Sequence, residues 1–479
     1  MLFNSLEFLW FLPVVFTAYW LLNRHLRLQN LMIVIASYVF YGWWDWRFLL
    51  LMTFTSVWSY VVGVLEFGRW QNEKGSKALL TISLIVNLGI LGVFKYYNFF
   101  VDSFLAAANA CLPSELVPRI SSLNVILPVG ISFYTFQALS YTIDVYRRQI
   151  VPTKDPVAFF AFISFFPQLV AGPIERATNL LPQFLKPRQF DYVLAVDGCR
   201  QMLWGLFKKI VMAETCGKVA DSIFANVGNE GGFMLWIGAV LFAFQIYGDF
   251  SGYSDVAIGC SRLFGFRLMR NFAFPYFARD IAEFWRRWHI SLTTGFRDYL
   301  YIPLGGSRCG LTRKIRNTFV IFLVSGFWHG ANWTFVIWGF VHACLFLPLL
   351  VFGKNRKYLG PVAEGRLLPS LGELFGMILT FVTVVLAWVF FRASDLSAAL
   401  LYLKGMFATV GSMQMPLRDL TPLMWSAVVM IVEWVNRDGQ HGLSILPRAR
   451  ILRWLIYLAL VTMCFAYFRR DAAFIYFQF

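Results

Sequence analysis

The sequence predicts an all-α polytopic integral membrane protein. Apolar residues make up 58% of the 479 residues and charged residues only 14%, a balance far from that of an ordinary soluble domain. The apolar residues gather in successive runs of roughly membrane-spanning length, with short basic gaps between them. No internal repeat, low-complexity tract or long linker divides the chain. We therefore expect one transmembrane domain over residues 1–479, with about 10–13 membrane-embedded helices.

The apolar runs define the predicted helices in chain order. The first has no basic leader and no evident small-residue cleavage site, so we interpret it as a span that is kept. Pro128, Pro167 and Pro173 interrupt some runs and others are shorter than usual, which predicts re-entrant or broken segments. The runs cover residues 6–22, 31–44, 48–67, 78–94, 127–146, 157–174, 192–212, 233–248, 318–351 as a pair, 374–391, 423–435 and 454–468.

Charge sets the predicted orientation. The formal net charge of +16 would suit a nucleic-acid-binding protein, but the basic residues lie mostly in short gaps, where they are better explained as topology signals. Residues 262–316 carry eleven Lys and Arg against Asp280, Glu283 and Asp298. The positive-inside rule places this block on the cytoplasmic face and the N-terminus outside. The seven cysteines show no metal-ligand spacing, so we predict no metal site.

A histidine lies within the longest uncharged run. Residues 317–353 contain no Asp, Glu, Lys or Arg, and as one helix they would be about 55 Å long, nearly twice the roughly 30 Å of bilayer hydrocarbon. We therefore expect two spans that break at residues 330–332, which puts His329 at membrane depth or near the far mouth of the first span. An imidazole there suits proton transfer. The alternative is a polar side chain that seals a helix contact.

A second histidine lies in the basic block. Asp280 followed by Glu283 predicts a helix start by a capping box. The i, i+3, i+4 spacing places five residues on one face of that helix: Trp285, Trp288, His289, Leu292 and Phe296. An interfacial helix with a satisfied His289 would explain the same pattern. Downstream, Gly305 and Gly306 would allow the backbone to approach a ligand phosphate.

A polar segment follows the apolar run 233–248. It contains Asp249, Ser251 and Asp255 at the expected end of a span. Carboxylates at a membrane boundary most often pair with nearby cations, so we expect a structural role for these residues. The candidate partners are Arg262, Arg267 and Arg270.

These motifs together resemble the membrane-bound O-acyltransferase (MBOAT) family. The histidines in residues 284–292 and 325–333 resemble the family's histidine pair. The similarity continues through residues 127–136, 165–174, 248–255, 297–306 and 474–479. It is strongest to the bacterial branch of alginate O-acetylation membrane proteins. One departure is the segment 293–296, where relatives usually have Ser followed shortly by Trp.

The resemblance implies a ring of tilted helices around a thin centre, with a cytoplasmic funnel and an opposing cavity that meet near His329. It implies acyl transfer from a cytoplasmic thioester, with acetyl-coenzyme A as the expected donor substrate and no bound cofactor. His329 would be the general base, and His289 would orient the thioester or stabilise developing charge. The expected donor contacts are Trp285, Arg286, Arg287, Trp288, Arg297, Tyr301, Gly305, Gly306, Trp328 and Asn332.

Three functions compete at this point. The first is O-acetylation of an extracytoplasmic polysaccharide from the bacterial inner membrane. The second is D-alanyl transfer to teichoic acid, or acylation of a lipid or secreted protein, by the same fold. The third is a transporter with His329 in a proton relay and Asp249 or Asp255 as ion ligands, which would more often show repeated halves. Because the chain has no sizeable soluble domain, we expect a partner acetyltransferase at the extracytoplasmic gaps 111–124 and 220–232.

Overall fold

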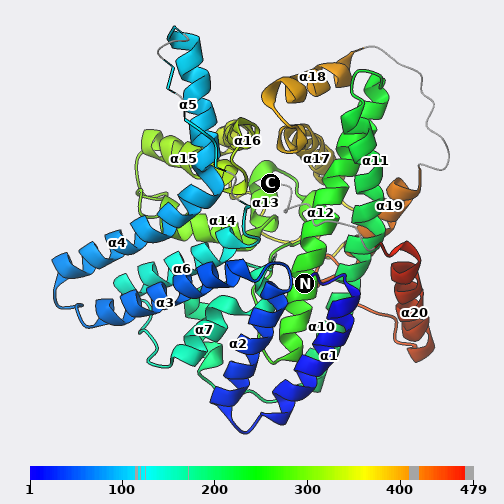
Figure 1. Ribbon diagram of the computed structural model, residues 1–479. Helices are drawn as coiled ribbons and strands as arrows, with labels where there is room; N and C mark the ends of the chain where they lie inside the picture. The colour runs from blue at the N-terminus through cyan, green and yellow to red at the C-terminus, as the bar shows by residue number, and fades with distance from the viewer. Residues whose placement is uncertain (114–116, 119, 124–125, 171, 409–419, 470–479) are drawn as a thin grey trace.

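The computed structural model describes residues 1–113, 117–118, 120–123, 126–170, 172–408 and 420–469, and every regular element in these ranges is helical (Figure 1). The predicted all-α class is therefore confirmed. Within these ranges, six helical segments are long and apolar enough to cross a membrane: Arg47–Phe67, Glu73–Cys111, Gly232–Leu263, Trp333–Val351, Leu371–Arg392 and Arg450–Tyr467. The total number of embedded helices and their ring arrangement stay predictions. The motif at 474–479 lies outside the described residues.

The N-terminal helices form one side of the molecule. They are α1 (Leu6–Leu21), α2 (Leu26–Gly42), α3 (Arg47–Phe67) and α4 (Glu73–Leu91). A π-helical turn, η1 (Gly92–Tyr96), joins α4 to α5 (Tyr97–Cys111). Figure 1 shows α5 projecting beyond the neighbouring helices. The apolar run predicted at 78–94 thus belongs to a longer helical segment.

The middle of the chain supplies short, buried helices. They are α6 (Ile131–Tyr146), α7 (Pro156–Ser164), α8 (Phe166–Leu169) and α9 (Ala177–Phe184). The predicted break of run 157–174 is confirmed, because α7 ends at Ser164 and α8 is a separate turn that contains Pro167. Gln168 and Gln137 both donate to the carbonyl of Phe162, at 3.1 Å each, which satisfies backbone that the break leaves open.

The long helix α12 (Gly232–Leu263) packs along α10 (Tyr192–Phe207), the π-helical η3 (Lys208–Ala213) and α11 (Glu214–Ala225). The predicted end of this span near residue 248 is wrong. The helix continues for fifteen more residues to Leu263, so Asp249, Ser251 and Asp255 lie inside it.

Two buried lysines explain why α12 can continue through its carboxylates. Lys208 of η3 lies 2.8 Å from Asp255 and donates to Ser251 at 2.8 Å. Lys209 lies 2.6 Å from Asp249. The ion pairs therefore use lysines from η3, and not the arginines expected from sequence proximity. Each buried charge has a partner, as a low-dielectric interior requires.

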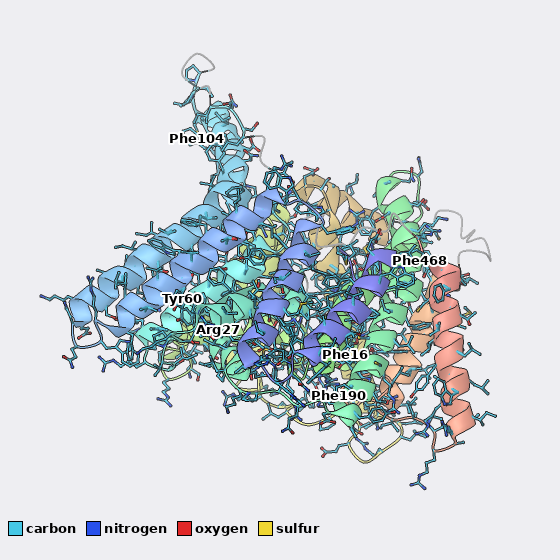
Figure 2. All side chains as sticks on the ribbon, turned by 60° about the horizontal axis from the view of Figure 1, so that its bottom comes forward. Phe16, Arg27, Tyr60, Phe104, Phe190 and Phe468 are labelled. Atoms are coloured by element: carbon cyan, nitrogen blue, oxygen red, sulfur yellow. The ribbon has the colours of Figure 1, made fainter. Side chains whose placement is uncertain are left out.

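The C-terminal half surrounds the two histidines. Its helices are η4 (Pro275–Phe277), α13 (Ile281–Arg287), α14 (Ile290–Phe296), the π-helical η5 (Arg297–Tyr301), α15 (Leu311–His329), α16 (Trp333–Val351), α17 (Leu371–Arg392), α18 (Leu396–Phe407), α19 (Thr421–Val435) and α20 (Arg450–Tyr467). Helix α20 has no buried residue, and Figure 2 shows its side chains and those around Phe104 of α5 pointing outward. These apolar outer surfaces suit contact with lipid.

Helices α15 and α16 approach each other through two glycines. A Cβ atom on Gly326 would lie 2.2 Å from the carbonyl oxygen of Phe335, and one on Gly339 would lie 2.3 Å from that of Phe322. Small residues at a helix crossing let two membrane helices come into backbone contact. This contact fixes the position of the end of α15, where His329 lies.

We predict that Gly339→Ala destabilises the protein by about 1–3 kcal/mol, because the added methyl group would push α16 away from α15. The measurement is the midpoint of thermal unfolding of the purified protein in detergent. Gly89→Ala is the matched control, since a Cβ atom at Gly89 of α4 meets nothing within 4 Å. Equal midpoints for the two variants would contradict the proposed close contact.

Candidate active site

His329 is the last residue of α15. The next residue, Gly330, has extended backbone, and Asn332 begins α16 by accepting a hydrogen bond from the amide of Thr334 at 3.0 Å. The predicted break at residues 330–332 is therefore confirmed. The imidazole of His329 is buried, with its ring edge-on to those of Trp338 and Phe391 at centroid distances of 5.4 and 5.5 Å. The site thus lies within the protein at a helix end.

His289 lies at a break between two helices. The prediction of one amphipathic helix from Asp280 to Phe296 is wrong, because α13 ends at Arg287 and α14 begins at Ile290. Asp280 does cap α13, accepting from the amide of Glu283 at 2.7 Å. His289 itself has a left-handed backbone with φ +45°. Such a conformation costs a β-carbon-bearing residue on the order of 1–3 kcal/mol, and it is typical of functional sites.

Asn271 compensates for this strain and orients the imidazole of His289. Its backbone carbonyl accepts from the amide of Ile290 at 2.9 Å, and its side-chain oxygen accepts from the hydroxyl of Ser291 at 2.9 Å. The same oxygen lies 3.1 Å from Nδ1 of His289, and the amide nitrogen of Asn271 donates to Ser254 at 3.0 Å. Since the Asn271 oxygen is the acceptor in this network, Nδ1 of His289 carries the proton and Nε2 stays an acceptor in the neutral ring.

Sequence reasoning missed Asn271. It lies in an irregular segment between α12 and η4, eighteen residues before His289, and no spacing or periodic pattern connects the two. The hydrogen bonds of Asn271 to Ile290, His289 and Ser291 bring the two segments together. The signal that could have marked it is weak: a single amide side chain between Arg270 and Phe272 in the basic block.

The two histidines share one cavity of about 290 Å³. Their ring centroids are 6.1 Å apart. Trp328 also lines this cavity, together with Lys95 of η1 and Trp44. The predicted pair of histidines, distant by forty residues in the sequence, is therefore brought together around a common space. The cavity reaches residues 126–128, which follow the gap 111–124 that we predict to be extracytoplasmic.

A second, larger cavity of about 1040 Å³ is lined by residues of α13, α14, α15 and α16. Of the predicted donor contacts, Trp285, Arg286, Arg297 and Tyr301 line it. Among the described residues, the two cavities have no lining residue in common, although His289 and Ile290 are neighbours in the chain and line different ones. The mouth of the larger cavity adds further cations: Lys314 and Arg356. Its walls include the apolar side chains of Ile321, Phe322 and Phe346.

Four other predicted donor contacts have structural roles in the fold. Trp288 is buried against Tyr247, Phe284 and Trp388. Asn332 caps α16 and donates to the carbonyl of Ser394 at 2.8 Å. Gly305 and Gly306 have left-handed backbones with φ +109° and +55°, which turn the chain from η5 towards α15. Among the described lining residues of either cavity, these four positions do not occur.

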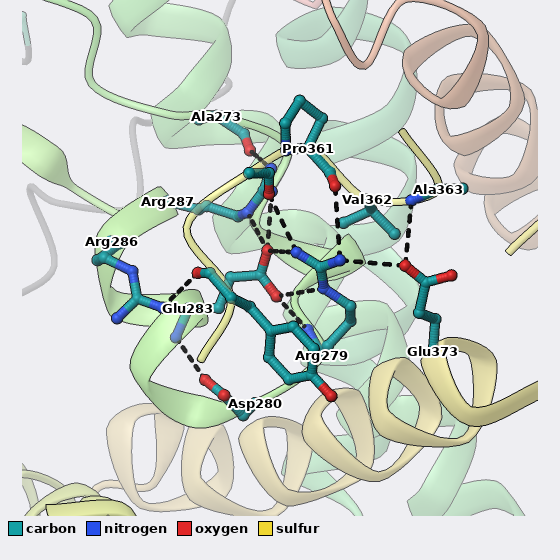
Figure 3. A network of polar contacts seen from close by, with 12 residues as sticks. Ala273, Arg279, Asp280, Glu283, Arg286, Arg287, Pro361, Val362, Ala363 and Glu373 are labelled. Carbon is teal, nitrogen blue, oxygen red and sulfur yellow. Dashed lines mark hydrogen bonds and ion pairs between the residues drawn. The ribbon is translucent and has the colours of Figure 1, made fainter. Parts of the chain in front are cut away.

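Arg287 belongs to a network that joins α13 to α17 (Figure 3). Glu283 accepts from Arg287 at 2.8 Å and from Arg279 at 2.9 Å, and Arg279 also donates to Glu373 of α17 at 3.1 Å. Figure 3 shows the guanidinium of Arg279 between the two carboxylates, with Arg286 on the opposite side of Glu283. Arg287 therefore fixes the scaffold, whereas Arg286 faces the larger cavity.

The cations of the larger cavity are held in place by specific acceptors. Arg286 donates to the carbonyls of Asn355 and Tyr358 at 2.7 Å each. Arg297 pairs with Asp298 at 2.6 Å, and Arg176 also binds Asp298. Burial of Asp298 would raise its pKa, but the hydrogen bond from Arg297 and the charge of Arg176 outweigh this effect and lower the pKa. Asp298 is thus an ionised anchor for two arginines.

Comparison with known proteins identifies the family. The model of MBOAT, the membrane-bound O-acyltransferase family, matches residues 90–388, which include both histidines. The chain is 41% identical over 409 residues to the probable alginate O-acetylase AlgI of Pseudomonas aeruginosa, covering 85% of this chain and 75% of that protein. It is 36% identical over 441 residues to the peptidoglycan O-acetyltransferase of Helicobacter pylori, covering 86% and 80%.

A more distant relative matches a smaller share of the chain. The teichoic acid D-alanyltransferase of Streptococcus thermophilus is 27% identical over 372 residues, covering 72% of this chain and 82% of that protein. The family model covers well over half of the chain, and the 41% identity extends across most of it. The resemblance inferred from the motifs is confirmed. This chain therefore belongs to the membrane-bound O-acyltransferase family and is a membrane acyltransferase.

Proposed function

We propose that this acyltransferase takes an acetyl group from cytoplasmic acetyl-coenzyme A and passes it across the bacterial inner membrane for O-acetylation of an extracytoplasmic polysaccharide. The relatives support polysaccharide O-acetylation, since their names describe alginate O-acetylation and peptidoglycan O-acetyl transfer. The observation that carries the proposal is the shared cavity of His289 and His329, with ring centroids 6.1 Å apart. D-alanyl transfer is the second candidate, favoured by the 27% identical relative.

The larger cavity suits the coenzyme part of the thioester donor, whose acyl end extends to the histidine cavity in this proposal. Arg286, Arg297, Lys314 and Arg356 supply positive charge for the phosphates of a coenzyme, while Ile321, Phe322 and Phe346 offer an apolar wall. Apart from Phe346 and Arg356, these residues belong to the basic block 262–316 or to α15, which begins at the end of that block. We place this cavity on the cytoplasmic side and the histidine cavity on the opposite side.

The histidines supply the proton chemistry. His329 removes the proton from the acceptor hydroxyl, the hydroxyl oxygen bonds to the thioester carbonyl carbon, and the carbon–sulfur bond breaks. The protonated imidazole then returns the proton to the leaving thiolate, so the enzyme ends unchanged. His289 presents Nε2 because Asn271 holds its Nδ1–H. There it orients the reacting groups, and when protonated it stabilises developing negative charge.

We predict that His329→Ala lowers acetyl transfer at least about 10²–10⁴-fold, the range expected for loss of a general base. His289→Ala should impair transfer less completely, because it removes a supporting interaction. The measurement is incorporation of radiolabel from acetyl-coenzyme A into polymer or partner protein, in membranes that contain equal amounts of variant or wild-type protein. Retention of the wild-type rate by His329→Ala, with normal accumulation in the membrane, would exclude His329 as the base.

We predict that a cysteine at Ser307 is labelled by an impermeant maleimide only when the cytoplasmic face is open. Ser307 is exposed and lines the larger cavity. The experiment uses a variant without the other native cysteines, as spheroplasts and as opened membranes. A matched variant that keeps only the exposed Cys111 at the end of α5 should be labelled in intact spheroplasts. Labelling of the Ser307→Cys variant in intact spheroplasts would reverse the donor side.

We predict that the protein alone does not acetylate polymer efficiently, because its extracytoplasmic gaps are too short to form a polysaccharide cleft. A folded partner would receive the acetyl group at the outer mouth. Of its two predicted contact segments, 111–124 lies partly outside the described residues. Segment 220–232 comprises the last six residues of α11, the connection 226–231 and the first residue of α12. The expected partner is an extracytoplasmic acetyltransferase.

The test uses liposomes that enclose the acceptor polysaccharide, with acetyl-coenzyme A supplied outside. Formation of labelled polymer by the wild-type protein when the partner is enclosed, and its loss in His329→Ala, would show that the reconstituted enzyme is active. We expect little labelled polymer until the partner is enclosed with it. Efficient labelling without a second protein would show that no partner is required.

A further inference from the structure

Lys95 and Tyr96 of the π-helical turn η1 contact the end of α15, where His329 lies. Lys95 donates from Nζ to the carbonyl oxygen of Trp328 at 2.7 Å and to that of His329 at 3.2 Å. Tyr96 donates from its hydroxyl to the carbonyl of Phe327 at 3.0 Å, and its ring stacks on that of Phe327 at 4.1 Å. Two successive residues of η1 therefore bind three successive carbonyls at the end of α15.

These contacts satisfy backbone carbonyls at the end of α15 that have no partner within the helix. The last four carbonyls of an α-helix have no partner within the helix, and their dipoles give that end a partial negative charge. The extended backbone of Gly330 does not fold back to satisfy them. An ammonium group at this position offsets the partial negative charge of the helix end, and its hydrogen bonds fix the backbone of His329.

The ammonium of Lys95 also faces the histidine cavity. It lines this cavity with His289 and His329, and among the described lining residues none is a carboxylate. An ammonium has three N–H groups, and two of the directions are taken by the carbonyls of Trp328 and His329. A lysine inside a membrane segment without a carboxylate beside it is costly, which favours a functional role over a purely structural one.

We propose that Lys95 is the electrophilic residue of the site: it holds the backbone of His329 in place and stabilises negative charge on the carbonyl oxygen of the acyl donor. The inference rests on the proposed acyl transfer. When the acceptor oxygen bonds to the thioester carbonyl carbon, the carbon–oxygen double bond becomes single and its electron pair moves to the oxygen. That oxygen then binds the ammonium until the pair returns and the carbon–sulfur bond breaks.

A simple helix cap would explain the carbonyl contacts alone. The two roles differ in what they require from the side chain. Capping needs only N–H donors, which the amide of glutamine also has. Stabilisation of an oxyanion needs positive charge, which arginine retains and glutamine lacks. Tyr96→Phe removes one of the three carbonyl bonds without any change of charge, and so controls for loosening of the helix end.

The test compares Lys95→Gln, Lys95→Arg and Tyr96→Phe in proteoliposomes that enclose the acceptor polysaccharide and the partner acetyltransferase, with kcat and KM for acetyl-coenzyme A measured by release of the free thiol. We expect Lys95→Gln to lower kcat by about 10²–10³-fold, the usual effect of losing one oxyanion-stabilising group, with little change in KM. Lys95→Arg should recover part of this loss. Tyr96→Phe should lower kcat by less than about tenfold, because one neutral hydrogen bond contributes about 1 kcal/mol.

Equal kcat values for Lys95→Gln and wild type would overturn the inference, as would equal losses in the glutamine and arginine variants. Thermal unfolding of each variant shows whether a loss comes from misfolding, and Lys95→Gln keeps the donors for the helix end. Failure of the wild-type protein to use acetyl-coenzyme A would instead overturn the proposed function. The two failures are therefore distinguishable.

Discussion

Helices that end inside a membrane protein leave backbone groups that lipid cannot satisfy, and the active-site region is built around this constraint. Near His329, η1 supplies Lys95 and Tyr96 to the carbonyls of α15. At His289, Asn271 accepts from the backbone of Ile290 and from the side chain of Ser291. Each histidine is thus placed at a helix end by side chains from distant segments. The irregular backbone at these helix ends leaves room for a cavity. The hydrogen bonds from the distant segments keep that backbone rigid, as catalysis requires.

Some of this arrangement could be predicted from sequence because it depends on local quantities. The length of the uncharged run 317–353 required a break, and the small and polar residues 330–332 located it. His329 was identifiable because ionisable groups are rare in such runs. The carboxylate of Asp280 marked the start of α13 by capping. In each case the decisive residues lie within a few positions of one another.

The rest depends on partners that are distant in the chain. Helix α12 continues through Asp249 and Asp255 because Lys208 and Lys209, some forty residues earlier, neutralise them. Nothing near Asp249 predicts this. The left-handed backbone of His289 follows from Asn271, eighteen residues upstream, and it divides a stretch whose periodicity favours one helix. Local pattern therefore gave the correct residue types and the wrong helix boundaries.

The π-helical turn η1 also sets a register. A π-turn accommodates one residue more than an α-helical turn, so it rotates everything beyond it by about 100° relative to a continuous α-helix. Helix α4 and the segment that includes Lys95 consequently present different faces to their neighbours. Loss of one of the three residues that precede Lys95 in this turn would turn Lys95 away from α15, although Lys95 itself is kept. The length of this short turn is therefore as important to the site as the residues it contains.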